Sequence, residues 1–230
     1  MARELRTALP NSVRLVESGG VSYLEFIPTV SGGRYLAVED NIQTVPALSF
    51  TDSTATTFSV VGFMPAMTAA PQPVNWVVVY NLGPGFTGAD AYVSGAGTNR
   101  AGIIAAAAAN RSITLDSNPF AVNGPANASP EQRFQVVSTP VTFRCVGAAN
   151  GTGTLMRSVG QFAAVQPTPA TGRLMANNVV SCRFSIGALA NQQAALIGLT
   201  LSLGRTGTAA QTNVIESVTL THQIHVDNTP

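Results

Sequence analysis

The sequence contains no lysine and few charged residues of either sign. Asp, Glu, Lys and Arg together make up 10% of its 230 residues, against roughly 25% in an ordinary soluble domain. A surface built instead from small polar residues repels itself weakly, which suits a subunit that contacts neighbours on several sides. All twelve basic residues are arginine, which pairs well inside interfaces, although a GC-rich genome would produce the same bias.

Cysteine and histidine are too scarce for most metal and redox sites. Cys145 and Cys182 are the two cysteines, and they make neither a disulfide framework nor a four-ligand zinc site. Both fall on the apolar face of a predicted strand, so a bridge across the core stays open, but we expect free thiols in a cytosolic product. His222 and His225 are three residues apart on one predicted strand and therefore face opposite sides, which argues against a shared metal or substrate.

Long apolar runs are also missing. The longest, Ile103 to Ala109, is far shorter than the ~18 residues that a membrane span requires. The first residues carry Arg3, Glu4 and Arg6 and lack the apolar segment of a secretory signal. We therefore expect a protein that is made in the cytosol and has no membrane partner.

Motifs for catalysis or metal binding are absent or incomplete. There is no G-x-S-x-G nucleophile motif. The segment 83–88 reads Gly-Pro-Gly-Phe-Thr-Gly, a literal G-x-G-x-x-G, but no helix is predicted after it, so it indicates a loop between strands. The acidic run 39–41, Glu-Asp-Asn, lacks the spacing that calcium requires and indicates a solvated turn, with interfacial calcium as the alternative. We expect no enzyme activity and no cofactor.

Short apolar runs separated by Gly, Pro and Asn clusters are typical of many short strands. The segment 135–146 alternates between apolar and polar residues, with Pro140 as a bend or bulge, and the continuous apolar run 75–82 indicates a strand covered on both faces. Helix is predicted only for a turn near 105–109 and for a segment that begins at Ser129-Pro130. Strands are also predicted at 23–30, 57–63, 179–186, 195–203 and 218–226. The pattern predicts an all-β fold, an eight-stranded jelly-roll β-sandwich with few short helices.

The segment 133–147, Arg-Phe-Gln-Val-Val-Ser-Thr-Pro-Val-Thr-Phe-Arg-Cys-Val-Gly, leads through a Gly-rich turn to Gly-Thr-Leu-Met at 153–156. It resembles the central strand pair of single jelly-roll coat proteins of noda-, tombus- and sobemo-like viruses. The segments 195–203 and 214–226, closing on His-Gln-Ile-His-Val, are similar to the last two strands of that family. The residues that this resemblance assigns to strand openings are Arg133, Val137, Ser138, Gly153 and Thr154.

The resemblance implies a capsid protein that assembles with itself into an icosahedral shell around a viral genome, either RNA or single-stranded DNA. It places the protein in the virion, assembled in the host cytoplasm or nucleus. It also divides the chain into an N-terminal arm at 1–13, a shell domain at 14–227 and a tail at 228–230.

In that family the arm is usually rich in Lys and Arg, because packaging depends on neutralising genome phosphates. Here only Arg3, Arg6 and Arg14 lie near the start. We expect these three residues to face the genome and to bind it weakly. The Asp cluster that binds calcium in some members of the family is missing as well.

Two other classes remain open. A monomeric β-sandwich binding module, carbohydrate-binding or adhesin-like, would expose aromatic side chains, whereas the single tryptophan, Trp76, lies in a run predicted to be core. An enzyme would require converging titratable groups, which the sequence does not offer.

Overall fold

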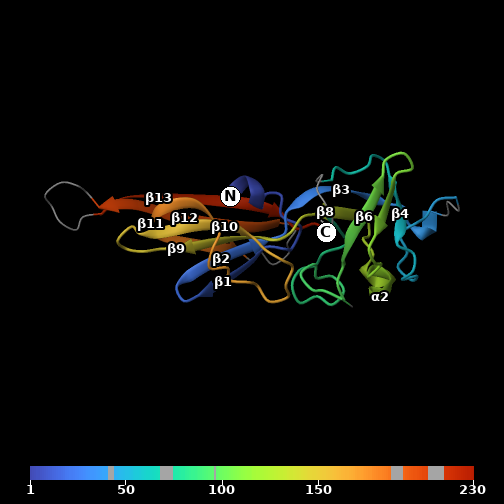
Figure 1. Cartoon of the computed structure of the whole chain (residues 1–230), viewed down its shortest axis with the longest axis horizontal. Coiled ribbons are helices and arrows are strands. Elements are labelled where there is room, and N and C mark those ends of the chain that lie inside the picture. The colour runs from blue at the N-terminus through green and yellow to red at the C-terminus, as the bar shows by residue number, and fades with distance from the viewer. Residues whose placement is uncertain (41–43, 68–74, 96, 188–193, 207–214) are drawn as a thin grey trace.

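The computed structural model describes residues 1–40, 44–67, 75–95, 97–187, 194–206 and 215–230. Within these residues the fold is all-β, as predicted, with about 48% of the chain in strands and 7% in helix. The strands build two lobes that lie end to end in an elongated molecule (Figure 1). The helical pieces are short: α1 (Ala2–Leu5), α2 (Phe120–Asn123) and the 3₁₀ turns η1 (Val38–Asp40) and η2 (Pro125–Asn127).

The first lobe is a seven-stranded antiparallel sheet with the order β1-β2-β9-β10-β11-β12-β13. Its three C-terminal strands are long and joined by successive pairings, so they extend the lobe away from the rest of the molecule (Figure 1). Its strands are β1 (Arg14–Ser18), β2 (Val21–Phe26), β9 (Val141–Val146), β10 (Gly153–Val159), β11 (Arg173–Gly187), β12 (Ala194–Thr206) and β13 (Ile215–Asp227).

Strand β11 changes partner halfway along its length. Up to Val179 it pairs with β10, and from Val179 onward it pairs with β12. Asn178 adopts a positive φ of 56° at the changeover, a conformation that few non-glycine residues take and that Asn tolerates best. Because β11 bends there, it also contacts β1, β2 and β9. The sheet therefore curls over itself as a two-layered, sandwich-like lobe.

A disulfide joins Cys145 on β9 to Cys182 on β11, with 6.3 Å between the two Cα atoms. The expectation of free thiols was therefore wrong. β9 and β11 are separated by β10 within the sheet, but the bend in β11 brings Cys182 back over Cys145, at a distance that a disulfide can bridge. The alternative that the sequence left open, a bridge across the core, is what the structure contains.

The second lobe is a closed antiparallel barrel with the strand order β3-β4-β7-β6-β5-β8. Aromatic rings fill its interior, including Phe58 and Phe134, which meet edge to face with centroids 5.4 Å apart. Its strands are β3 (Thr29–Tyr35), β4 (Thr57–Val61), β5 (Trp76–Val78), β6 (Arg100–Ala107), β7 (Ser112–Leu115) and β8 (Arg133–Val137).

Two crossings carry the chain between the lobes, from β2 to β3 and from β8 to β9. They run side by side, since Phe26 pairs with Val141 on one side and Thr29 pairs with Val137 on the other. The Ser138 amide donates to the carbonyl oxygen of Pro28 at 3.0 Å between them. A proline in each crossing interrupts the ladder, as predicted for Pro140, because it lacks an amide hydrogen.

The described residues contain thirteen strands where eight were predicted. Part of the difference comes from the prolines, which split the predicted runs 23–30 and 135–146 into β2 with β3 and β8 with β9. The run 75–82 is strand only over Trp76–Val78. Val77, Val78 and Val79 are nevertheless fully buried, as expected of a segment covered on both faces.

Both predicted helical segments were wrong. Residues 105–107 end strand β6, because Ala105 and Ala106 pair with Thr114 and Ile113 of β7 and this pairing outweighs the helix propensity of alanine. At Ser129 the chain makes a single turn instead of a helix. The Ser129 hydroxyl accepts a hydrogen bond from the Arg133 amide at 3.1 Å, which leads directly into β8.

Candidate functional site

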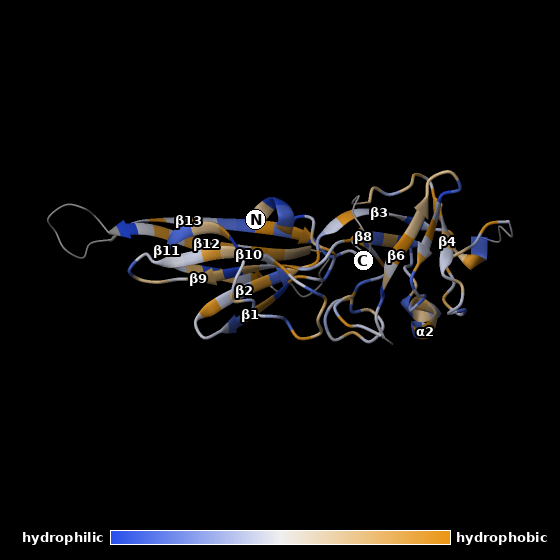
Figure 2. Cartoon of the chain, viewed as in Figure 1, coloured by the Kyte–Doolittle hydropathy of each residue, from blue (hydrophilic) through white to orange (hydrophobic). Residues whose placement is uncertain are grey.

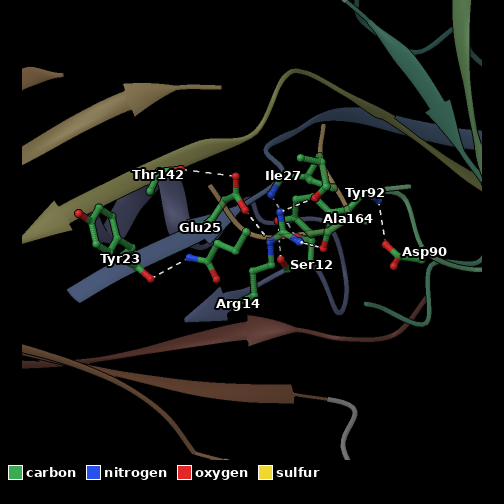
Figure 3. A network of polar contacts seen from close by, with 11 residues as sticks. Ser12, Arg14, Tyr23, Glu25, Ile27, Asp90, Tyr92, Thr142 and Ala164 are labelled. Carbon is green, nitrogen blue, oxygen red and sulfur yellow. Dashed lines mark hydrogen bonds and ion pairs between the residues drawn. The ribbon is translucent and has the colours of Figure 1, made fainter. Parts of the chain in front are cut away.

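A network of polar contacts lies where the two lobes meet (Figure 3). Arg14 on β1 and Glu25 on β2 form its centre, with 2.5 Å between the Arg14 Nε and the Glu25 Oε2. Their side chains are 11% and 0% exposed. The other guanidinium nitrogens of Arg14 donate to the carbonyl oxygens of Ala163 and Ala164 at 2.8 and 2.9 Å. The pair is thus held from several sides.

The barrel lobe contributes Tyr92, from the segment between β5 and β6. The Arg14 guanidinium carbon lies 3.6 Å from the centroid of the Tyr92 ring, a cation–π contact. The Tyr92 hydroxyl donates to the Ser12 carbonyl oxygen at 2.7 Å, and its amide donates to Asp90 at 2.9 Å. Tyr92 therefore forms hydrogen bonds with residues of both lobes, and the network connects the two lobes.

The network lies among apolar side chains contributed by both lobes. Leu9, Ile27, Val78 and Val137 pack with Tyr92 in a cluster distinct from the cores of the two lobes. Phe162 covers this cluster, meeting Trp76 edge to face at 5.0 Å between centroids and carrying the Arg100 guanidinium on its ring. This apolar surrounding limits how the lobes can rotate against each other.

Burial controls the ionisation of the network. Desolvation raises the pKa of Glu25 above 4.5, opposed by the Arg14 charge and by hydrogen bonds from Arg14 and Thr142. Desolvation also raises the pKa of Tyr92 well above its usual value. Because Glu25 is fully buried, it cannot contact a substrate in this conformation. The network therefore consists of contacts within the protein, and these contacts connect the two lobes.

The three arginines predicted to face a genome lie in different surroundings. Arg14 belongs to the buried network just described, so it does not lie on an exposed face. Arg3 and Arg6 are exposed, at α1 and immediately after it. The segment 1–13 packs against the lobes, since Leu5 and Leu9 are fully buried within it. The structure does not bring the three arginines together.

The residues assigned to strand openings lie at both ends of β8, just after it, and at the start of β10. Arg133 begins β8 and forms an ion pair with Glu131, and Val137 ends that strand as part of the buried interlobe cluster. Gly153 and Thr154 begin β10, which pairs with β9 across the Gly-rich turn. A Cβ on Gly153 would lie 2.3 Å from the carbonyl oxygens of both Val146 and Val179. Only glycine fits there.

Other sequence candidates remain separate from one another. His222 and His225 are both exposed on β13. The segment 83–88 is a loop between β5 and β6, and the described residues between it and β6 contain no helix, as predicted. Glu39 and Asp40 lie in η1, and Asn41 lies outside the described residues. Among the described residues no three His, Cys, Asp or Glu side chains gather closely enough to hold a metal ion.

A hollow of about 480 Å³ opens on the barrel and is lined in part by Arg100, Asp116 and Asn118. Most polar groups of these three residues are engaged within the protein, although the buried Asn118 Oδ1 has no hydrogen-bond partner. Arg100 donates to the carbonyl oxygens of Ala91 and Val93, and Asp116 accepts from the Gly102 amide at 3.0 Å. The Asn118 amide nitrogen donates to three backbone carbonyl oxygens. These contacts favour a structural role for the lining residues.

Large apolar side chains are exposed on both lobes, and hydrophobic and hydrophilic residues are interspersed along the strands (Figure 2). Phe63, after β4 of the barrel, is 96% exposed, and Val165, in the segment between β10 and β11, is 84% exposed. On β13, Val218 and Leu220 are 65% and 56% exposed. Single exposed apolar side chains occur on most protein surfaces, whereas Val218 and Leu220 are neighbours on one face of a strand at the end of the sheet.

Compared with models of known protein families, with curated proteins and with solved structures, the chain matches none. In the part of the chain that the structure describes, no helix has the length and apolar character needed to cross a membrane.

Proposed function

We propose that this chain is a capsid subunit that assembles with copies of itself into a closed icosahedral shell. In this proposal the curled seven-stranded lobe is a wall-forming sandwich of jelly-roll type, and the barrel is a second lobe that the buried Arg14–Glu25 network holds at a fixed angle. The two-layered sheet, the low charge and the exposed apolar side chains support it.

The observation that carries the proposal is the unprotected edge of β13. This strand has thirteen residues, forms the end of the sheet and pairs with β12 without a bulge. Monomeric proteins protect such edges with charged side chains, above all lysine, and with proline, bulges or short strands. β13 has no lysine, proline or bulge, and its two acidic residues, Glu216 and Asp227, lie near its ends. An open edge with exposed apolar side chains favours pairing with another chain.

A closed shell also requires each subunit to have more than one contact surface. The exposed side chains meet this requirement, since Phe63 lies on the barrel while Val218 and Leu220 lie on the sheet lobe. In a shell with closed point-group symmetry, distinct patches on one subunit contact different neighbours. Genome binding would be weak, because Arg3 and Arg6 are the exposed members of the predicted set and supply few phosphate contacts.

Size-exclusion chromatography with light scattering tests this proposal on the purified chain at physiological salt. The expected result is a megadalton species in equilibrium with small oligomers. A monomer at every concentration would contradict it, and glycan binding by that monomer would favour the binding-module alternative.

A further inference from the structure

Building on the proposed self-assembly, we propose that β13 pairs antiparallel with β13 of a second copy about a two-fold axis through Thr219. This pairing would join two seven-stranded sheets into one continuous sheet. It makes the edge strand the dimer contact from which larger assemblies grow. The residues that carry it, Glu216 to His222, are all exposed in the single chain.

The two ends of β13 differ in what covers them. Near the barrel, Ile224 and Val226 are fully buried and share a core cluster with Leu5, and Asn228 is bonded to Asn11. The other end projects beyond α1 (Figure 1). Only this outer end is therefore open to a partner.

Side chains alternate along β13, so even-numbered residues share the face of Ile224 and Val226. Val218 and Leu220 lie on this face beside Leu203 and Leu201 of β12, which are their register partners. His222 separates these two apolar residues from the buried Ile224 on the same face, and on β13 the row has no neighbour on its outer side among the described strands. An added strand would cover that side.

The identity of the side chains favours one register. A two-fold axis normal to the sheet places residues of the same face opposite each other, with the axial residue opposite its own copy. An axis at Thr219 sets Val218 opposite Leu220 and Glu216 opposite His222. An axis at Leu220 would instead set Glu216 against Ile224, and an axis at Thr221 would set it against Val226. Both alternatives place a carboxylate against a buried apolar side chain.

Complementarity between the facing side chains points to a second copy of this chain as the occupant. At the Thr219 register, Glu216 lies between Arg205, its register partner on β12, and His222 of the partner subunit. Symmetry repeats this arrangement at the other end of the paired segment. The Glu216 carboxylate can accept a hydrogen bond from the facing imidazole, and the two Val218–Leu220 pairs between the ends are apolar, so the facing side chains are compatible along the ladder. The strand is complementary to itself.

A cysteine on the axis tests the pairing. Both native cysteines are in the disulfide, so Thr219→Cys adds the single free thiol. Facing Cα atoms on antiparallel strands are about 4.5–5.5 Å apart, a separation that a disulfide spans. We expect mild oxidation to convert Thr219→Cys to a covalent dimer on non-reducing gels.

Ser217→Cys is the matched control, because at this register its two copies are four residues apart, about 13 Å along the strand. We expect no dimer band for this variant. A dimer from Ser217→Cys, or none from Thr219→Cys, would overturn the register.

A second pair of variants separates this contact from assembly in general. In the Thr219→Cys background, Val218→Lys with Leu220→Lys should abolish the covalent dimer, because lysines would then face each other across the axis. Val122→Lys, at a residue of similar exposure on α2 (61%), should leave the dimer intact.

These experiments distinguish failure of this inference from failure of the proposed function. Large particles that form without the Thr219 cross-link would overturn the β13 pairing and would still support the proposed shell. A cross-linked dimer that never grows further would support the pairing and overturn the shell. A monomer without any cross-link would overturn both.

Discussion

Glu25 has a fully buried carboxylate and one charged partner. A charge removed from water is tolerated only when it is paired and hydrogen-bonded, and Arg14 supplies both the charge and a bond. The same Arg14 contacts Tyr92 of the other lobe. A single ion pair thus belongs both to the fold of the sheet lobe and to its connection with the barrel.

Replacing Arg14 with methionine keeps most of the side-chain volume but leaves Glu25 without its charged partner. Removing one member of a buried pair costs about 3–5 kcal/mol, so we expect Arg14→Met to lower the free energy of unfolding by that amount in urea titrations. Adding Glu25→Gln should restore part of the loss, because no charge would then remain buried. If Arg14→Met unfolds like the wild type, the pair does not stabilise the junction.

The raised pKa of Glu25 predicts a pH dependence with a defined sign. Because its folded pKa lies above 4.5, the carboxyl group's contribution to stability is fully present below pH 4.5 and is lost as pH rises through the folded pKa. We expect the stability of the wild type relative to Glu25→Gln to fall over that interval and then level off. Urea titrations of both proteins at a series of pH values measure this difference, and a difference that rises with pH would refute the assigned sign.

The sequence contains enough information to predict that Arg14 and Glu25 lie opposite each other, although the prediction made for Arg14 was that it faces a genome. Gly19 and Gly20 both have positive φ, as a two-residue hairpin turn requires. Such a turn sets Ser18 opposite Val21, and counting outward sets Arg14 opposite Glu25. Tyr92 could not be placed this way, because 67 residues separate it from Glu25 and no local pattern fixes that contact.

At the scale of strands, β10 begins where the backbone leaves no room for a side chain. Gly153→Ala would place a Cβ against two carbonyl oxygens, so we expect a loss of about 1–3 kcal/mol or more in the free energy of unfolding. Gly160→Ala, just after β10, is the control, because nothing lies within 4 Å of its Cβ position. Thermal melts of the two variants should differ clearly, and equal melting temperatures would contradict the close approach.

The disulfide connects the two layers of the sheet lobe. It closes a loop between residues 37 apart in sequence, and bridges of this kind contribute about 2–4 kcal/mol. We expect Cys145→Ala with Cys182→Ala to lower the free energy of unfolding by that amount, while far-UV circular dichroism stays unchanged. Two titratable thiols in the denatured, unreduced wild type would contradict the bridge.

Strands were easier to predict than their arrangement. Alternation placed Val141, Phe143 and Cys145 on one face of a strand, and all three are buried. The bend in β11 was not visible, because Asn177-Asn178 lies inside a run that is otherwise extended and the partner change depends on contacts distant in sequence. The free-thiol prediction failed for the same reason, since that bend brings Cys182 to Cys145.

At the scale of the whole molecule, the division into two lobes also lay beyond the sequence pattern. The segments 29–137 and 141–227 both consist of short apolar runs and turns, with no change of composition between them. What separates them is the closure of six strands into a barrel, a result of pairing between distant segments. The elongated molecule offers contact surfaces on both lobes, which a shell subunit requires.

Negative-stain electron microscopy of the purified chain tests the central claim most directly. Closed assembly of one subunit produces particles of one or a few discrete diameters, and the account predicts such hollow shells. Open filaments would contradict the closed shell, and a field without particles at concentrations where the protein is soluble would contradict the proposed function itself.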